Sequence, residues 1–117
     1  MPDAVEREAL RARAAKNQSL FREVNERIGT LPRDALYSLF ICECLDETCS
    51  EHVSLTFEEY EHVRSGSNRF LVLPGHEVPE VEETLEQTDR FYVVAKLGVG
   101  ALIAEHLDPR KRQRVAR

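Results

Sequence analysis

Three cysteines lie within eight consecutive positions of this chain, and they constrain its possible folds more than any other feature. Cys42, Cys44 and Cys49 cannot all pair with one another in disulfides, because one thiol is left over. The first residues lack the apolar segment of a secretory signal peptide, so we expect a cytoplasmic location, where thiols stay reduced. Clustered cysteines there favour a metal site. The alternatives are a disulfide between Cys44 and Cys49, or thiols that simply fill the core.

A structural zinc site has four ligands in a tetrahedron, and the cysteines supply three of them. The C-x-C-x4-C spacing indicates metal binding, and the sequence offers four histidines for the fourth position. His76 directly follows Gly75, a residue that lets the backbone approach a metal closely. His52 and water are the alternative fourth ligands. The predicted site is therefore one Zn²⁺ bound by Cys42, Cys44, Cys49 and His76.

Residues 3–28 have the composition of one long helix, rich in Ala, Arg, Glu and Leu. Asp3 is suited to cap its start, and Gly29 is suited to end it. An apolar stripe should form its buried side: the second half packs on the core, while residues 6–16 project or pair weakly with a second copy of the chain. The stripe consists of Leu10, Ala14, Asn17, Phe21, Val24 and Ile28.

Strands are predicted where β-branched, aromatic and other apolar residues gather, at residues 36–44, 53–55, 69–73 and 91–96. A capping box formed by Thr56 and Glu59 predicts a helix over residues 56–64. Two further short helices are predicted, at residues 77–86 and 101–107. In the first of these, Val81 and Leu85 should face inward.

These elements predict an α+β protein in which a long N-terminal helix packs on a small, mainly antiparallel sheet with a zinc-clamped turn. The length of 117 residues suits one domain with one modest core. We expect an N-terminal helix (residues 1–30), a zinc-stabilised α+β domain (residues 31–109) and a basic, disordered tail (residues 110–117).

Charge separates the centre of the chain from its C-terminal end. Residues 36–90 carry thirteen acidic and three basic side chains, and so acidic a surface repels a phosphate backbone, which argues against nucleic acid as a partner of the central domain. Residues 110–117 carry five basic side chains and could reach an anionic partner, nucleic acid included. No apolar run approaches the roughly 18 residues of a membrane span, so no membrane partner is expected.

The residues around the cysteines follow a pattern: F-x-C-E-C-x4-C at residues 40–49, L-T-x-x-E-Y-E-x-V-R at residues 55–64, and R-F-x-V-x-P-G-H at residues 69–76. This pattern resembles an uncharacterised family of small actinobacterial proteins. The resemblance implies that the three cysteines and His76 belong to one shared feature. It implies no activity.

The sequence favours a small, non-enzymatic zinc-binding protein, a regulatory or protein-interaction module with an unknown protein partner. A filled Cys3His shell leaves no open coordination position, which a catalytic zinc keeps for water. One alternative is a zinc-thiolate redox switch. The other is a small zinc-dependent or thiol enzyme, in which Glu43 supplies a carboxylate or Cys49 pairs with His52 or His76.

Overall fold

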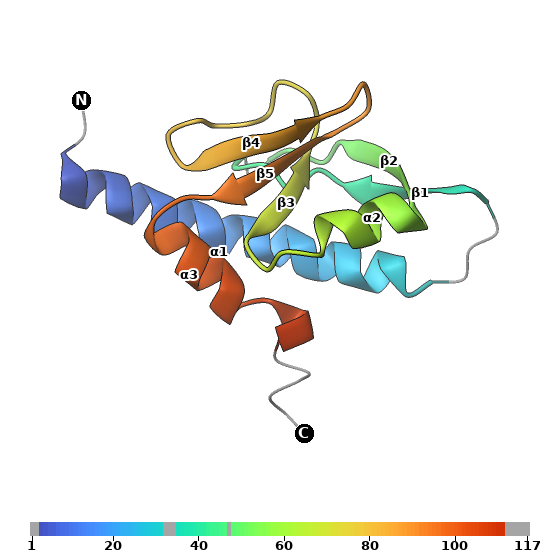
Figure 1. Ribbon diagram of the computed structural model, residues 1–117, viewed down its shortest axis with the longest axis horizontal. Coiled ribbons are helices and arrows are strands. Elements are labelled where there is room, and N and C mark those ends of the chain that lie inside the picture. Colours follow the sequence, from blue (N-terminus) through green and yellow to red (C-terminus); the bar gives the residue numbers. More distant parts are fainter. Residues whose placement is uncertain (1–2, 32–34, 47, 112–117) are drawn as a thin grey trace.

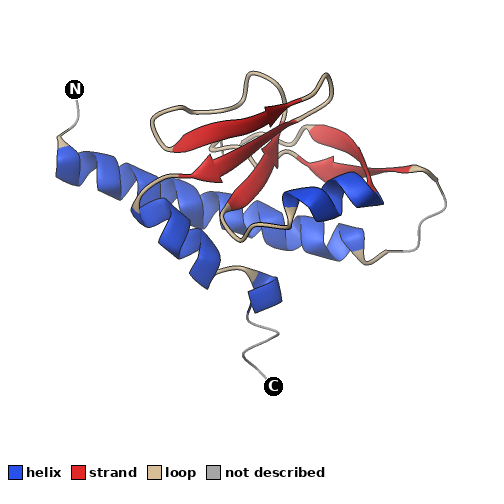
Figure 2. Cartoon of the chain, viewed as in Figure 1, coloured by secondary structure: helices blue, strands red, loops and turns tan. Residues whose placement is uncertain are grey.

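The structure, a computed structural model, describes residues 3–31, 35–46 and 48–111 and has the predicted α+β architecture. A long helix, α1, runs beneath two small antiparallel sheets, with α3 beside it and α2 next to the strands (Figures 1 and 2). In chain order the elements are α1 (Ala4–Gly29), β1 (Tyr37–Ile41), β2 (His52–Thr56), α2 (Phe57–Val63), β3 (Arg69–Val72), β4 (Glu82–Gln87), β5 (Tyr92–Lys96) and α3 (Val99–His106).

The strands form two sheets instead of the single sheet expected. One is the hairpin of β1 and β2, and the other has the order β3-β5-β4, with every neighbouring pair antiparallel. The segment after β1 connects them, because the Cys42 amide donates to the Glu51 carbonyl at 3.0 Å and the next amide, of Glu43, donates to the Leu71 carbonyl at 2.8 Å. The chain therefore passes from one sheet to the other at Cys42 and Glu43.

Strand β4 is the largest departure from the predicted secondary structure, since a short helix was expected over residues 77–86. Glu82 lies opposite Lys96 in the β4–β5 register and forms a buried ion pair with it at 2.7 Å. Cross-strand pairing with the β-prone strand β5 thus overrides local helical preference. Val81 is buried as predicted, but Leu85 lies at an irregularity in the strand register and is 40% exposed.

Helix α2 begins as its sequence predicts. The Thr56 hydroxyl accepts from the Glu59 amide at 3.1 Å, and the Glu59 carboxylate accepts from the Thr56 amide at 2.9 Å, which is a complete capping box. Tyr60 is buried and stacks on Phe40 of β1, with the ring centroids 4.3 Å apart. Helix α2 is thereby fixed over the β1–β2 hairpin.

The buried side of α1 coincides only in part with the predicted apolar stripe: Ala14 is fully buried and Ile28 packs against the core, but polar residues outside the stripe are buried as well. Gln18, Arg22 and Asn25 are fully buried, whereas Val24 of the stripe is 41% exposed. The reason is that these three polar side chains bond to buried groups elsewhere in the fold, so a polar residue occupies the core side at little cost. Asn25, for example, donates to the Ile41 carbonyl at 2.8 Å and accepts from the Ile41 amide at 2.8 Å.

Residues 4–7 of α1 are exposed, but the first half of the helix does not project from Glu8 onward, which corrects a second expectation in part. It packs against α3, where the Val99 amide donates to Glu8 at 3.1 Å, and Ala14 and Ala15 are fully buried. Gly100 makes the contact close, since a Cβ added there would lie 3.0 Å from the Arg11 carbonyl oxygen. Pairing with a second copy through α1 stays a prediction.

The folded part of the chain extends past the predicted start of the tail. The Arg110 side chain donates to Glu26 at 2.7 Å and to Glu61 at 2.5 Å, so this residue belongs to the domain. Residues 112–117, the rest of the predicted tail, lie outside the described residues. Within residues 3–31, 35–46 and 48–111, no helix combines the length and the apolar character needed to cross a membrane.

Candidate metal centre

Cys42 and Cys44 lie in the segment that joins the two sheets. Strand β1 ends at Ile41, and the chain stays extended long enough for the amides of Cys42 and Glu43 to bond to different strands. Residues two apart in an extended chain point to the same side, so both thiols face the same region, and both are buried at 0% and 1% exposure.

Cys49 is brought back to the same region by a tight turn. The Asp46 carboxylate accepts from the Thr48 amide at 2.9 Å and from the Thr48 hydroxyl at 2.7 Å, and the Cys49 amide donates to the Asp46 carbonyl at 3.0 Å. An aspartate at the first position of such a turn stabilises it in this way. The turn therefore positions the third thiol, which is only partly buried.

His76 reaches the cysteines through a turn at the end of β3. The His76 amide donates to the Leu73 carbonyl at 2.9 Å, with Pro74 and Gly75 between them. Gly75 has a φ of 89°, which is the positive value that a type II turn requires at this position. The Pro-Gly pair is the sequence signal for this turn, and it carries the imidazole toward the thiols.

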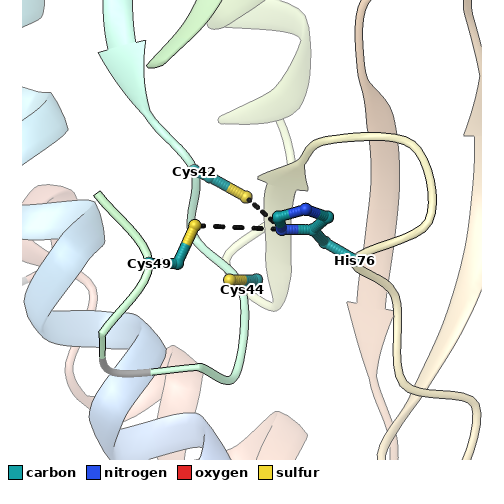
Figure 3. A group of neighbouring side chains, drawn as sticks. All are labelled: Cys42, Cys44, Cys49 and His76. Carbon is teal, nitrogen blue, oxygen red and sulfur yellow. Dashed lines mark hydrogen bonds between the residues drawn. The ribbon is translucent and has the colours of Figure 1, made fainter. Parts of the chain in front are cut away.

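The four side chains meet in one place, as Figure 3 shows. One ligand atom from each of Cys42, Cys44, Cys49 and His76 lies within 4.8 Å of all the others. His76 Nδ1 is 3.6 Å from Cys42 Sγ and 3.8 Å from Cys49 Sγ. Tetrahedral zinc with ordinary bond lengths has N···S and S···S edges of about 3.6 and 3.8 Å, so this spacing suits a four-coordinate ion.

The structure therefore brings together all four residues that the sequence singled out. His52, the alternative fourth ligand, is exposed on β2 and is not part of the cluster among the described residues. The strand explains the difference: Val53 is buried, so its neighbour His52 points to the opposite, exposed side.

Two groups around the ligands escaped prediction. The Glu51 carboxylate lies 3.5 Å from His76 Nε2, the ring nitrogen that faces away from the thiols, and the Leu73 amide donates to Cys42 Sγ at 3.2 Å. Contacts of this kind orient metal ligands. No sequence signal points to Glu51, because its approach to His76 depends on how the two sheets meet.

Burial makes the thiols of Cys42 and Cys44 poor acids in the absence of a cation. Burial raises the pKa of the Cys42 thiol, and the neighbouring Cys44 and Cys49 raise it further, although the Leu73 amide acts in the opposite direction. Burial likewise raises the pKa of the Cys44 thiol. A divalent cation reverses this preference by binding the thiolates and releasing their protons. The cluster is therefore chemically suited to a cation.

Glu43, considered as a catalytic carboxylate, lies away from the thiols. It is fully buried, and its two oxygens accept from the Asn25 side chain at 2.8 Å and from the Leu71 amide at 2.9 Å. Burial raises the pKa of this carboxyl to about 7, while the two hydrogen bonds act in the opposite direction. Alternation along the extended chain explains its orientation, since Glu43 sits between two cysteines. Through these two hydrogen bonds Glu43 links α1 to β3.

A surface pocket of about 360 Å³ borders the cluster. Cys44 and His76 form part of its wall, so the pocket gives small molecules access to one side of the ligand group. Its other lining residues are Leu45, Asp46, Gly75 and Val78.

Comparison of the chain with protein-family models, with curated proteins and with solved structures finds no match.

Proposed function

We propose that the protein is a small, non-enzymatic zinc protein that binds one Zn²⁺ through Cys42, Cys44, Cys49 and His76. The observation that carries the proposal is the meeting of three sulfurs and one imidazole nitrogen within 4.8 Å of one another. Thiolate and imidazole ligands in a tetrahedral arrangement favour zinc over the oxygen-seeking Mg²⁺ and Ca²⁺. The four ligands fill the shell, so the ion has a structural role.

The connections of the ligands support that role. Cys42 extends the β1–β2 hairpin, because its backbone amide donates a hydrogen bond to the Glu51 carbonyl. His76 follows β3 of the other sheet through the turn that begins at Leu73. One ion bound by both would fasten the two sheets to each other. Because the binding free energy of such an ion is also folding free energy, the ion stabilises the arrangement of the whole domain.

We assign the protein a role in binding another protein, in a regulatory or adaptor capacity. The support is the exposed apolar surface around β1, where Tyr37 is 46% exposed and Leu39 is 60% exposed, two residues apart and so on the same face of the strand. Exposed apolar side chains that lie together mark sites of association. The cytoplasm is the proposed location, since three reduced thiols are needed for the metal.

Metal analysis tests the zinc assignment. Protein purified without chelator or affinity metal should contain one zinc per chain. Inductively coupled plasma mass spectrometry measures this ratio. The variant His76→Ala should lose zinc, and the matched control His52→Ala, an exposed histidine, should retain it. Metal-free wild-type protein, or equal loss in both variants, would contradict the assignment.

A thiol enzyme is the second candidate, and one observation favours it. Cys49 Sγ lies 3.8 Å from His76 Nδ1, the arrangement of a nucleophile and its base, and the nearby pocket offers room for a substrate. This candidate leaves Cys42 and Cys44 without a role. The thiol-enzyme proposal would be favoured over the zinc proposal by two results together: metal-free protein that keeps its fold, and an alkylating reagent that modifies Cys49 much faster than it modifies a free thiol.

A further inference from the structure

The three ligand thiols differ in their access to solvent. Cys42 and Cys44 are 0% and 1% exposed, whereas Cys49 is only partly buried. Cys49 is therefore the most exposed of the three ligand residues. This difference between chemically identical ligands is the starting point for assigning them different reactivity.

Cys42 is also the most firmly held of the three. Its amide extends the β1–β2 ladder by donating to the Glu51 carbonyl at 3.0 Å, and its sulfur accepts from the Leu73 amide at 3.2 Å. A hydrogen bond to a thiolate stabilises it and lowers its reactivity as a nucleophile. Among the described residues, no backbone amide donates to the sulfur of Cys49. Solvent exposure and the absence, within the described chain, of a stabilising amide hydrogen bond thus both indicate that Cys49 is the most reactive of the three thiolates.

All three sulfurs lie within 4.8 Å of one another, and the way the chain connects them favours Cys44 as the disulfide partner of Cys49. Cys44 and Cys49 are the two ends of a short loop, closed where the Cys49 amide donates to the Asp46 carbonyl at 3.0 Å, and their sulfurs lie within 4.8 Å. Cys42 and Cys44 are separated by a single residue whose amide is paired with β3, so a bond between them requires that pairing to break. A small movement of the loop, by contrast, joins Cys44 to Cys49.

We propose that Cys49 is a site of oxidation by hydrogen peroxide or another hydroperoxide, and that Cys44 completes the reaction as a Cys44–Cys49 disulfide that expels the zinc. The inference rests on the proposed function, because it concerns the same zinc-bound thiolates. Cys49 is reached from its own partly exposed side, and the pocket lined by Cys44 and His76 leaves room beside the second thiol for water to depart.

The reaction balances with peroxide as the only oxidant. The Cys49 thiolate attacks one peroxide oxygen, the O–O bond breaks, and the departing hydroxide takes a proton to leave as water, so that Cys49 becomes a sulfenic acid. The Cys44 thiolate then attacks that sulfur, and the hydroxyl group leaves with a second proton as a second water. The two sulfurs lose two electrons and the peroxide gains them. Only Cys42 and His76 remain as ligands, too few to retain Zn²⁺.

Loss of the ion would undo the joint between the sheets. Cys42 belongs to the hairpin side and His76 to the β3 side, so the proposed oxidation separates two parts that the zinc holds together. The exposed apolar surface around β1 then changes its position relative to the rest of the domain. Oxidation thereby regulates the proposed interaction with a protein partner.

The test uses zinc-loaded wild-type protein and needs no variant that could fail to fold. Hydrogen peroxide is added in less than one equivalent, released zinc is followed with a chromogenic chelator, and the cysteines are mapped by mass spectrometry after alkylation. We expect one zinc released per disulfide, a Cys44–Cys49 bond and a free Cys42. In unoxidised protein, brief iodoacetamide treatment should label Cys49 first.

A disulfide that contains Cys42, oxidation without zinc release, or first labelling of Cys42 or Cys44 would overturn the inference. Zinc stoichiometry measured before oxidation separates this failure from failure of the proposed function: a protein that never holds zinc fails the earlier proposal. Addition of a reductant and Zn²⁺ should restore zinc content and the original melting temperature. Failure of that restoration would also overturn a regulatory role.

Discussion

At the scale of single residues, the cluster depends on groups that are not themselves ligands. His76 presents Nδ1 to the thiols while Nε2 faces Glu51 at 3.5 Å, so the carboxylate holds the ring in the orientation that a metal needs. A carboxylate in this position also makes the imidazole a better electron donor. Glu51 is the single residue whose contribution to the site is most readily measured.

Replacing Glu51 should weaken zinc binding without unfolding the protein. We expect Glu51→Gln to lower the zinc affinity by roughly 10- to 100-fold, since the ring loses its charged partner. Competition with a chelator of known affinity measures this change. Glu58→Gln, at an exposed position on α2, is the matched control and should bind zinc as the wild type does. An unchanged affinity in Glu51→Gln would assign no role to this contact.

A second residue-scale prediction concerns the buried pair of Arg64 and Asp108. The side chains are 0% and 4% exposed and bond directly to each other, so removing the Asp108 charge leaves the buried Arg64 with Glu26, at 3.2 Å, as its remaining carboxylate partner. We expect Asp108→Asn to lower the free energy of unfolding by about 3 kcal/mol, measured by denaturant titration at pH 7. Glu105→Gln is the control, because the Glu105–Lys111 pair is exposed and should contribute little.

The same pair makes a prediction about pH. Although burial opposes it, the charge of Arg64 together with its hydrogen bond lowers the pKa of Asp108 below the ordinary value of 3.8. The stabilising contribution is therefore fully present above pH 3.8 and declines as the pH falls through the lowered pKa. The difference in stability between wild type and Asp108→Asn should shrink under acid conditions. A constant difference down to the lowest pH at which the protein folds would show that the ion pair is not its origin.

At the scale of elements, α1 organises the molecule through polar contacts. The fully buried Arg22 side chain donates to the Ser67 carbonyl at 2.5 Å and to the Ala104 carbonyl at 2.7 Å, and its guanidinium lies over the Phe70 ring at 4.6 Å. These groups belong to the turn before β3, to α3 and to β3 itself. One helix side chain thus connects three segments, which explains why α1 buries a polar side.

Because α1 and α3 approach each other closely at Gly100, we expect this position to tolerate no larger side chain. A Cβ at Gly100 would lie 3.0 Å from the Arg11 carbonyl oxygen and 3.7 Å from the Ala15 side chain. We expect Gly100→Val to force the helices apart and to lower the free energy of unfolding by about 1–3 kcal/mol. Leu102→Val on the exposed side of α3 places the same residue type in the same helix and should cost less than about 0.5 kcal/mol. Helix propensity favours Val over Gly, so a loss at Gly100 no larger than that at Leu102 would contradict the packing argument.

At the scale of the whole molecule, the cluster stands at the junction of two small sheets. A two-stranded hairpin is marginally stable by itself, and the β1–β2 hairpin relies on α1, α2 and the joint with β3. A metal ion at that joint would make the hairpin part of one cooperative unit. Its removal should therefore act locally before it acts on the whole fold.

Zinc removal should loosen the joint more than the three-stranded sheet. After chelation we expect the melting temperature to fall by roughly 10 °C or more, since metal binding contributes folding free energy. In hydrogen exchange, the amides of Cys42 and Glu43, which bond to Glu51 and Leu71, should lose protection first. The β5 amides serve as the internal control and should stay protected under mild conditions. Uniform loss across both regions would indicate that the zinc stabilises the fold without any special effect on the joint.

The sequence by itself determined those features that depend on neighbouring residues. The capping box of Thr56 and Glu59 and the Pro-Gly turn before His76 are local hydrogen-bond and backbone effects, so their outcome needs no knowledge of the rest of the chain. The thiol spacing likewise limited the cluster to one short segment plus one histidine. This local information sufficed to predict the α+β class and to select the residues that meet in the cluster.

Only the tertiary structure decided which polar groups are buried and how the sheets divide. Glu82 joins a strand because Lys96 lies opposite it, and Arg22 turns inward because carbonyl groups distant in sequence accept its hydrogen bonds. Burial of a polar group is favourable only with partners in place, and those partners come from other elements. The hydrophobic pattern of α1 could not reveal them, so it indicated only part of the buried side and missed Gln18, Arg22 and Asn25, which long-range hydrogen bonds turn inward.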